Sequence, residues 1–189
     1  HVDNHLEFRS GYEVHTGVNF KKEGLIENFE IFPKKNIIVP ESTYDHVEVQ
    51  IYFTTPPTSK FSFSVMNYIG GFFGGDRVSS SPRIKIRFGD KFNSEFGYNY
   101  NDVRLPGGNF NTYLSRSRLT YSFNPKMYIQ ALIQYNNQSN ESFINWRFIL
   151  QRTAASGFYL VYNQMEDYDG IPTNRSNSLI LKYSHLFDF

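Results

Sequence analysis

The sequence predicts an all-β protein, an antiparallel up-and-down transmembrane β-barrel. Apolar residues recur at every second position over most of the chain, which is the period that places side chains on alternate faces of a strand. The connections between these segments alternate between short and long, and 18% of the 189 residues are aromatic. Short turns at one end, long loops at the other and aromatic girdles at both interfaces are typical of bacterial outer-membrane barrels.

Each predicted strand is a run of alternating residues. The first run extends over about fifteen residues from Leu6 to Phe20, which is longer than an ordinary strand. The last run places Leu179, Leu181 and Tyr183 on one face and Ile180 and Lys182 on the other. We expect about ten strands, at 6–20, 47–53, 61–65, 84–88, 92–100, 112–123, 127–135, 144–150, 158–163 and 178–189.

The connections fall into two groups in an up-and-down meander, because every second connection lies at the same end. We expect short or moderate turns at 55–59, 89–91, 124–126 and 151–157. We expect longer, polar loops at 21–43, 70–77, 101–111, 136–141 and 164–177.

Composition excludes several classes of protein. The chain has 19 basic and 18 acidic residues, so its net charge does not favour a nucleic-acid partner. It has no cysteine, and its five histidines show no ligand spacing along the sequence, so we expect no metal site or cofactor. No apolar run approaches the roughly 18 to 20 residues of a transmembrane helix. The chain begins at His1 rather than at Met, so we expect it to be a piece of a longer or processed protein.

The alternation alone does not say which face of the sheet meets water. In a soluble lipocalin-like barrel or β-sandwich the apolar face would point inward. A membrane barrel is favoured because the charged face also carries amides and a hydroxyl suited to a polar lumen, and because rings cluster at strand ends. The polar set is Asn99, Thr120, Gln130, Gln134 and Asn145.

Several motifs resemble a bacterial family common in Bacteroidetes, which pairs an N-terminal family-9-like carbohydrate-binding domain with a C-terminal outer-membrane barrel. The similar stretches are "FEIFP…IIVPESTY" (29–44), "LPGGNF" (105–110), "SRLTYSFNPKMYIQALIQYN" (117–136), "NWRFIL" (145–150), "GFYLVYNQ" (157–164) and "SLILKYSHLF" (178–187). The resemblance covers roughly residues 25–189. It implies that this chain is the C-terminal part of a larger barrel, without its signal peptide and carbohydrate-binding domain. The "RTAASG" segment at 152–157 departs from the Pro-Gly-Ser turn that is usual in the family.

Three groups of residues are candidates for function. The first is a basic stripe on the polar face, which would either pair with acidic neighbours or favour anionic solutes such as acidic sugars. Its members are Arg83, Lys85, Arg87, Arg116, Arg118, Arg147 and Lys182. The second is a flexible "GGFFGGD" loop that exposes Phe72 and Phe73 to a sugar or a partner. The third is a C-terminal signal for the outer-membrane assembly machinery, made of Tyr183, Phe187 and Phe189.

The sequence therefore predicts a protein of the cell outer membrane that acts as an anchor or pore, with the lipid bilayer and the assembly machinery as its partners. A carbohydrate ligand is implied by the resemblance. The alternative is a soluble all-β domain that binds a ligand. An outer-membrane hydrolase is a third hypothesis, and no catalytic motif supports it.

Overall fold

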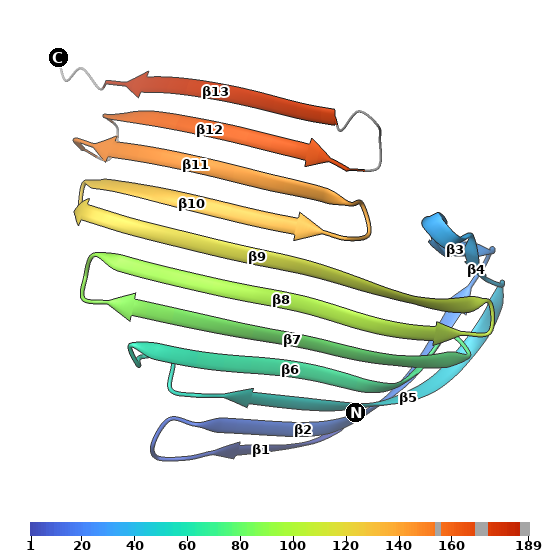
Figure 1. Ribbon diagram of the computed structural model, residues 1–189. Coiled ribbons are helices and arrows are strands. Elements are labelled where there is room, and N and C mark those ends of the chain that lie inside the picture. The colour runs from blue at the N-terminus through green and yellow to red at the C-terminus, as the bar shows by residue number, and fades with distance from the viewer. Residues whose placement is uncertain (154–155, 169–173, 186–189) are drawn as a thin grey trace. The chain divides into compact units, whose positions relative to one another are not determined.

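The computed structural model describes residues 1–153, 156–168 and 174–185 (Figure 1). The described residues form thirteen strands and one short 3₁₀ helix, and none of their helices is long and apolar enough to span a bilayer. The strands are β1 (Val2–Glu7), β2 (Glu13–Leu25), β3 (Phe29–Phe32), β4 (Ile37–Val39), β5 (Ser42–Thr54), β6 (Phe61–Phe72), β7 (Gly75–Phe88), β8 (Phe92–Leu105), β9 (Gly108–Asn124), β10 (Met127–Asn136), β11 (Glu141–Gln151), β12 (Gly157–Asp167) and β13 (Asn174–Ser184). The 3₁₀ helix η1 covers Pro33–Lys35.

Eleven strands form one antiparallel sheet in the order β1-β2-β5-β6-β7-β8-β9-β10-β11-β12-β13, and β3 pairs with β4 in a separate ribbon. Within the large sheet, each strand lies beside the next one along the chain. The prediction of an all-β, antiparallel, up-and-down sheet is therefore confirmed. The sheet is not closed, because β1 and β13 do not pair in the part of the chain that the structure describes.

The chain divides into two compact units. The first comprises His1–Arg83 with Tyr98–Tyr113, and the second comprises Ile84–Gly97 with Leu114–Phe189. The boundary cuts across β7, β8 and β9 rather than between strands. The domain prediction, a single barrel domain or barrel segment over 1–189, stays a prediction.

The predicted first strand, 6–20, is wrong. The chain turns back between β1 and β2, and Gly11 adopts a φ of +81° in this turn, a conformation that glycine reaches without strain. The Gly11 N–H donates to the Phe8 carbonyl at 2.8 Å, and the Phe8 N–H donates to the Tyr12 carbonyl at 2.9 Å. The alternation does not indicate this turn, because the apolar residues before it and after it all lie at even positions.

Two of the predicted long loops are also wrong. Strand pairing continues into 70–77 and 101–111, and only Phe73–Gly74 and Pro106–Gly107 remain as turns. Phe73 and Gly74 have φ values of +46° and +78°, the signs that a two-residue hairpin with a primed turn requires. A positive φ costs a Phe energy that the usual Asn would avoid, and the ring offsets this cost by packing at 4.7 Å on Phe72 and at 5.5 Å on Tyr44.

The predicted 21–43 loop holds additional structure, which forms the hydrophobic core of the first unit. β3, η1 and β4 bring Phe32, Ile37 and Val39 against the ends of β8 and β9. Phe32 stacks on Phe110 with ring centroids 4.7 Å apart and an interplanar angle of 16°. The buried members of this core are Phe32, Ile37, Val39, Val103, Leu105 and Phe110.

Candidate functional site

In the first unit, the register of β2 against β5 separates polar from apolar side chains. Asn19 lies opposite Glu48, and Val18 lies opposite Val49. Successive residues of a strand point to opposite faces, so we call the side of the Asn19–Glu48 pair the polar face and the other side the apolar face. Large exposed side chains of the apolar face are Val2, Leu6, Phe20, Val47, Val49 and Ile51.

The second unit has the same division. Gln130 lies between Thr120 and Arg147 on neighbouring strands, and its amide donates to the Thr120 hydroxyl at 3.2 Å. The polar face is not purely polar, because Ile180 is exposed on it. Large exposed side chains of the apolar face are Leu119, Tyr121, Ile133, Trp146, Leu150, Leu179, Leu181 and Tyr183.

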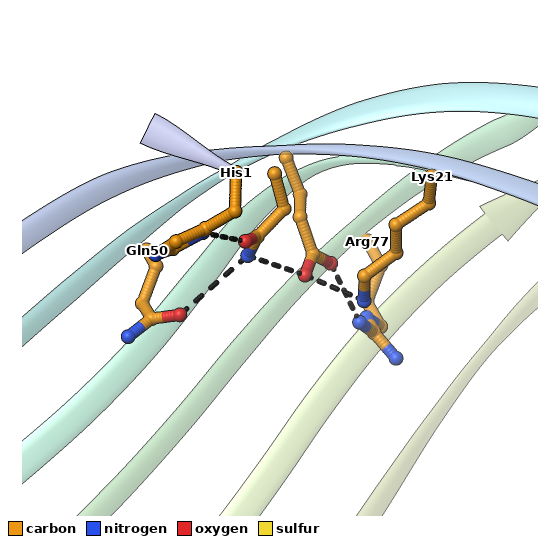
Figure 2. Close-up of polar contacts among 6 residues, drawn as sticks. His1, Lys21, Gln50 and Arg77 are labelled. Carbon is orange, nitrogen blue, oxygen red and sulfur yellow. Dashed lines mark hydrogen bonds and ion pairs between the residues drawn. The ribbon is translucent and has the colours of Figure 1, made fainter. Parts of the chain in front are cut away.

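A buried carboxylate lies at the centre of the polar face of the first unit. Glu48 is only 2% exposed, although its side chain is charged. Lys21 Nζ donates to Glu48 Oε1 at 2.7 Å, and Arg77 donates to Glu48 Oε2 at 2.9 Å. The Asn19 amide adds a third donor at 3.1 Å, and it also contacts Gln50 and His1 (Figure 2).

The ion pairs and hydrogen bonds of this network allow the Glu48 carboxylate to be buried in its charged form. Removing an ionised group from water is costly unless opposite charges and hydrogen bonds replace the lost hydration. Both oxygens of Glu48 accept from cations on β2 and β7. Glu48 therefore joins three strands, β2, β5 and β7, through side chains alone.

The predicted basic stripe is placed on every second strand, β7, β9, β11 and β13, of the sheet. Lys85, Arg87 and Arg118 line an open pocket of about 230 Å³ in the second unit, together with Asn93, Ser94, Glu95 and Thr120. Among the described residues, Lys85, Arg116 and Arg118 form no ion pair. A pocket with this excess of cationic side chains attracts anions.

Two of the remaining stripe residues, Arg147 and Lys182, have neutral side chains as neighbours. Arg147 Nε donates to Asn145 Oδ1 at 2.7 Å, and Lys182 Nζ lies 6.0 Å from the centre of the Tyr159 ring. Arg83 lies on β7 two residues before Lys85, in the first unit. The residues of the predicted basic stripe therefore belong to two different units: Arg83 to the first, and the others to the second.

The expectation of an exposed, flexible loop around Phe72 and Phe73 is wrong. Both side chains are half-buried, and they pack against the core of the first unit. The Arg77 guanidinium lies 4.3 Å from the centre of the Phe72 ring, so one side chain links this aromatic pair to Glu48. The two rings therefore support the tight β6–β7 turn and the charged network next to it.

The predicted C-terminal signal lies partly outside the described residues. Tyr183 is on the apolar face of β13 and is 68% exposed. Phe187 and Phe189 are outside the described residues.

Residues of the polar face that the sequence did not single out are Asn19, Lys21 and Arg77. Asn19 and Lys21 belong to the polar side of the first predicted strand, but alternation does not say which residues they contact, and Arg77 falls inside the predicted 70–77 loop. The continued alternation from Arg77 to Arg87 could have placed Arg77 on the polar face as well. The histidines have no ligand spacing along the sequence, but the β1–β2 hairpin places His5 directly opposite His15.

Comparisons with protein-family models, with curated proteins and with solved structures found no match for this chain. The resemblance drawn from the sequence motifs stays a prediction.

Replacing Glu48 with Gln should destabilise the first unit. The substitution keeps the size of the side chain but leaves Lys21 and Arg77 without their shared counter-charge. Breaking a buried ion pair by removing one partner costs about 3 to 5 kcal/mol, and the partial exposure of Lys21 reduces this cost. Chemical unfolding in detergent, followed by the loss of the far-ultraviolet circular dichroism signal of the strands, measures the change in stability.

The control for this prediction is Asp45→Asn. Asp45 and Lys22 are also an acid–base pair of β5 and β2, but their side chains are 72% and 71% exposed and 3.8 Å apart. This substitution should change the stability by less than about 1 kcal/mol. A Glu48→Gln protein as stable as the unaltered chain would show that the network does not hold the three strands together.

Proposed function

We propose that this chain is a segment of an outer-membrane β-barrel that acts as an anchor or pore. The single observation that carries the proposal is the exposed apolar face on both units of a sheet whose other face is polar. Trp146, Leu179, Leu181 and Tyr183 are 44%, 69%, 64% and 68% exposed. Burial of apolar area is favourable by about 25 cal/mol per Å², so a surface of this kind requires cover, and lipid acyl chains provide it.

Strand length supports the same proposal. A β-strand needs about 9 to 11 residues to cross the hydrocarbon core at its usual tilt. β10, β11, β12 and β13 have 10, 11, 11 and 11 residues. β7, β8 and β9 have 14, 14 and 17 residues, so each could cross a bilayer and extend beyond it.

The apolar face exposes a large ring, because Trp146 is 44% exposed and lies opposite the small Ala131. An exposed ring of this kind suits an interface with flexible lipid chains. The soluble ligand-binding domain is the alternative that the experiments below would reveal.

A role in carbohydrate binding or uptake is part of this proposal and depends on the resemblance alone. The cationic pocket lined by Lys85, Arg87 and Arg118 is compatible with an acidic sugar. Within a pore, the same side chains would favour anions over cations. The proposal is an anchor or pore, and it names no enzymatic reaction.

The fluorescence of Trp146 tests the proposal, because it is the only tryptophan of the chain. In vesicles made of lipids with brominated acyl chains, Trp146 should be strongly quenched, and aqueous iodide should quench it weakly. The control protein carries Trp146→Phe and Gln130→Trp. Gln130 lies on the neighbouring strand opposite Arg147, so the indole moves to the polar face at nearly the same level.

The control protein should show the reverse pattern, with strong quenching by iodide and weak quenching by brominated lipid. A chain that does not associate with vesicles, or a Trp146 that neither quencher reaches, would support the soluble alternative and contradict the proposal.

Conductance across planar bilayers tests whether the protein is an anion-preferring pore. Replacing Arg116 and Arg118 with Gln should lower the preference for chloride over potassium, most clearly at low ionic strength, where charges are least screened. The matched control replaces Arg104 and Arg175, which lie on the apolar side of their strands, and should leave selectivity unchanged. Unchanged selectivity in the Arg116 and Arg118 protein would contradict the basic stripe, and a protein that inserts without conductance would be an anchor.

A further inference from the structure

Three metal-ligating side chains meet on the polar face of the β1–β2 hairpin. Within residues 1–153, 156–168 and 174–185, His5, Glu13 and His15 form the one group of at least three such side chains whose ligand atoms lie within 4.8 Å of one another. Glu13 Oε2 is 3.5 Å from His15 Nε2 and 4.0 Å from His5 Nε2. The two imidazole rings have their centroids 3.7 Å apart.

The hairpin creates this geometry from residues that are distant in sequence. His5 and His15 are direct cross-strand partners, and Glu13 is two positions from His15, on the same face. Along a single extended strand the two histidines would be about 33 Å apart. The Gly11 turn therefore assembles the group.

The contacts within the cluster leave one polar atom unsatisfied. His15 Nε2 is buried and has no hydrogen-bond partner. It lies near the carboxylate of Glu13, and the His15 ring makes an edge-to-face contact with the Tyr52 ring at 5.1 Å between centroids. A buried polar atom without a partner requires an explanation, and a metal ion between His15 and Glu13 would satisfy it.

We propose that His5, Glu13 and His15 bind a divalent transition metal ion, with Zn²⁺ as the best match. Two imidazoles and one carboxylate are a known zinc donor set, and they leave a fourth tetrahedral position for water. With metal–ligand distances near 2.1 Å, ligand atoms of a tetrahedral site are about 3.4 Å apart. The Glu13–His15 separation of 3.5 Å is close to this value, and the His5–Glu13 separation of 4.0 Å exceeds it, so the exposed His5 side chain must move closer to complete the site.

The consequence for the fold is a cross-link between β1 and β2. β1 has six residues, all of them exposed, and β2 is its only partner within the described structure. An ion that binds residues of both strands would stabilise this edge of the sheet, because it binds the folded hairpin and not the unfolded chain.

The test is titration of the detergent-solubilised full chain, without a polyhistidine tag, with Zn²⁺ by calorimetry. The chain has no cysteine, so thiolates do not compete for the ion. We expect one ion per chain, a higher unfolding temperature with Zn²⁺, and a visible absorption band typical of tetrahedral coordination when Co²⁺ replaces Zn²⁺.

The variants His5→Gln, Glu13→Gln and His15→Gln should each weaken Zn²⁺ binding by more than about tenfold, because even outer-shell partners of a metal site contribute that much. They should also lose the Zn²⁺-dependent rise in unfolding temperature. His185→Gln is the matched control, since it removes an imidazole that is not in the cluster, and it should bind Zn²⁺ as the unaltered chain does.

Circular dichroism confirms that each variant keeps its strands before its affinity is compared. An unaltered chain that binds no Zn²⁺ would overturn the proposal. Cluster variants that bind Zn²⁺ as tightly as the His185→Gln control would overturn it as well, because the ion would then bind elsewhere.

Discussion

The structure depends on one constraint, the register between neighbouring antiparallel strands. A slip of one residue would transfer every side chain of a strand to the opposite face. In the first unit the register of β2 against β5 places Asn19 beside Glu48 and Val18 beside Val49. In the second unit the register of β10 against β11 places Gln130 beside Arg147 and Ala131 beside Trp146. Polar atoms thereby meet polar atoms, and apolar side chains form continuous surfaces. The buried Glu48 reinforces the register, because a slip would remove its carboxylate from Lys21 and Arg77.

The two faces of the sheet have different physical requirements, and the proposed function rests on this difference. On the polar face, side chains satisfy one another by hydrogen bonds and ion pairs, as Gln130 does with Thr120 and Glu48 does with its two cations. On the apolar face, rings and branched side chains remain exposed after the strands have paired. Contact with water is unfavourable for such a surface, whereas contact with lipid is not. The proposed membrane role, the proposed anion preference and the proposed metal site all use this separation, since the basic stripe and the His5, Glu13 and His15 cluster lie on the polar face.

The sequence predicted those properties that depend on the period of two. The all-β class, the up-and-down order and the face of residues such as Arg118, Trp146 and Lys182 follow from alternation, and the structure agrees with each of them. Alternation does not reveal a turn that keeps the same phase, so it predicts one strand where the structure has the β1–β2 hairpin. The sequence does not predict the Phe73–Gly74 turn, because its first residue is not one that favours a positive φ. The partners of Glu48 and the proximity of His5 to His15 depend on pairings between strands, which a single sequence does not specify.

The most direct test of the account is a cysteine scan along β11. The chain has no cysteine, so each residue from Phe143 to Leu150 can be replaced in turn and labelled alone. In lipid vesicles, a spin label at 144, 146, 148 and 150 should be accessible to oxygen dissolved in the acyl chains. Labels at 143, 145, 147 and 149 should instead be accessible to a water-soluble paramagnetic complex. If one side of the sheet faces lipid, the accessibility to oxygen and to the water-soluble complex should alternate in this way along β11. The opposite phase, or equal accessibility at all eight positions, would contradict the account.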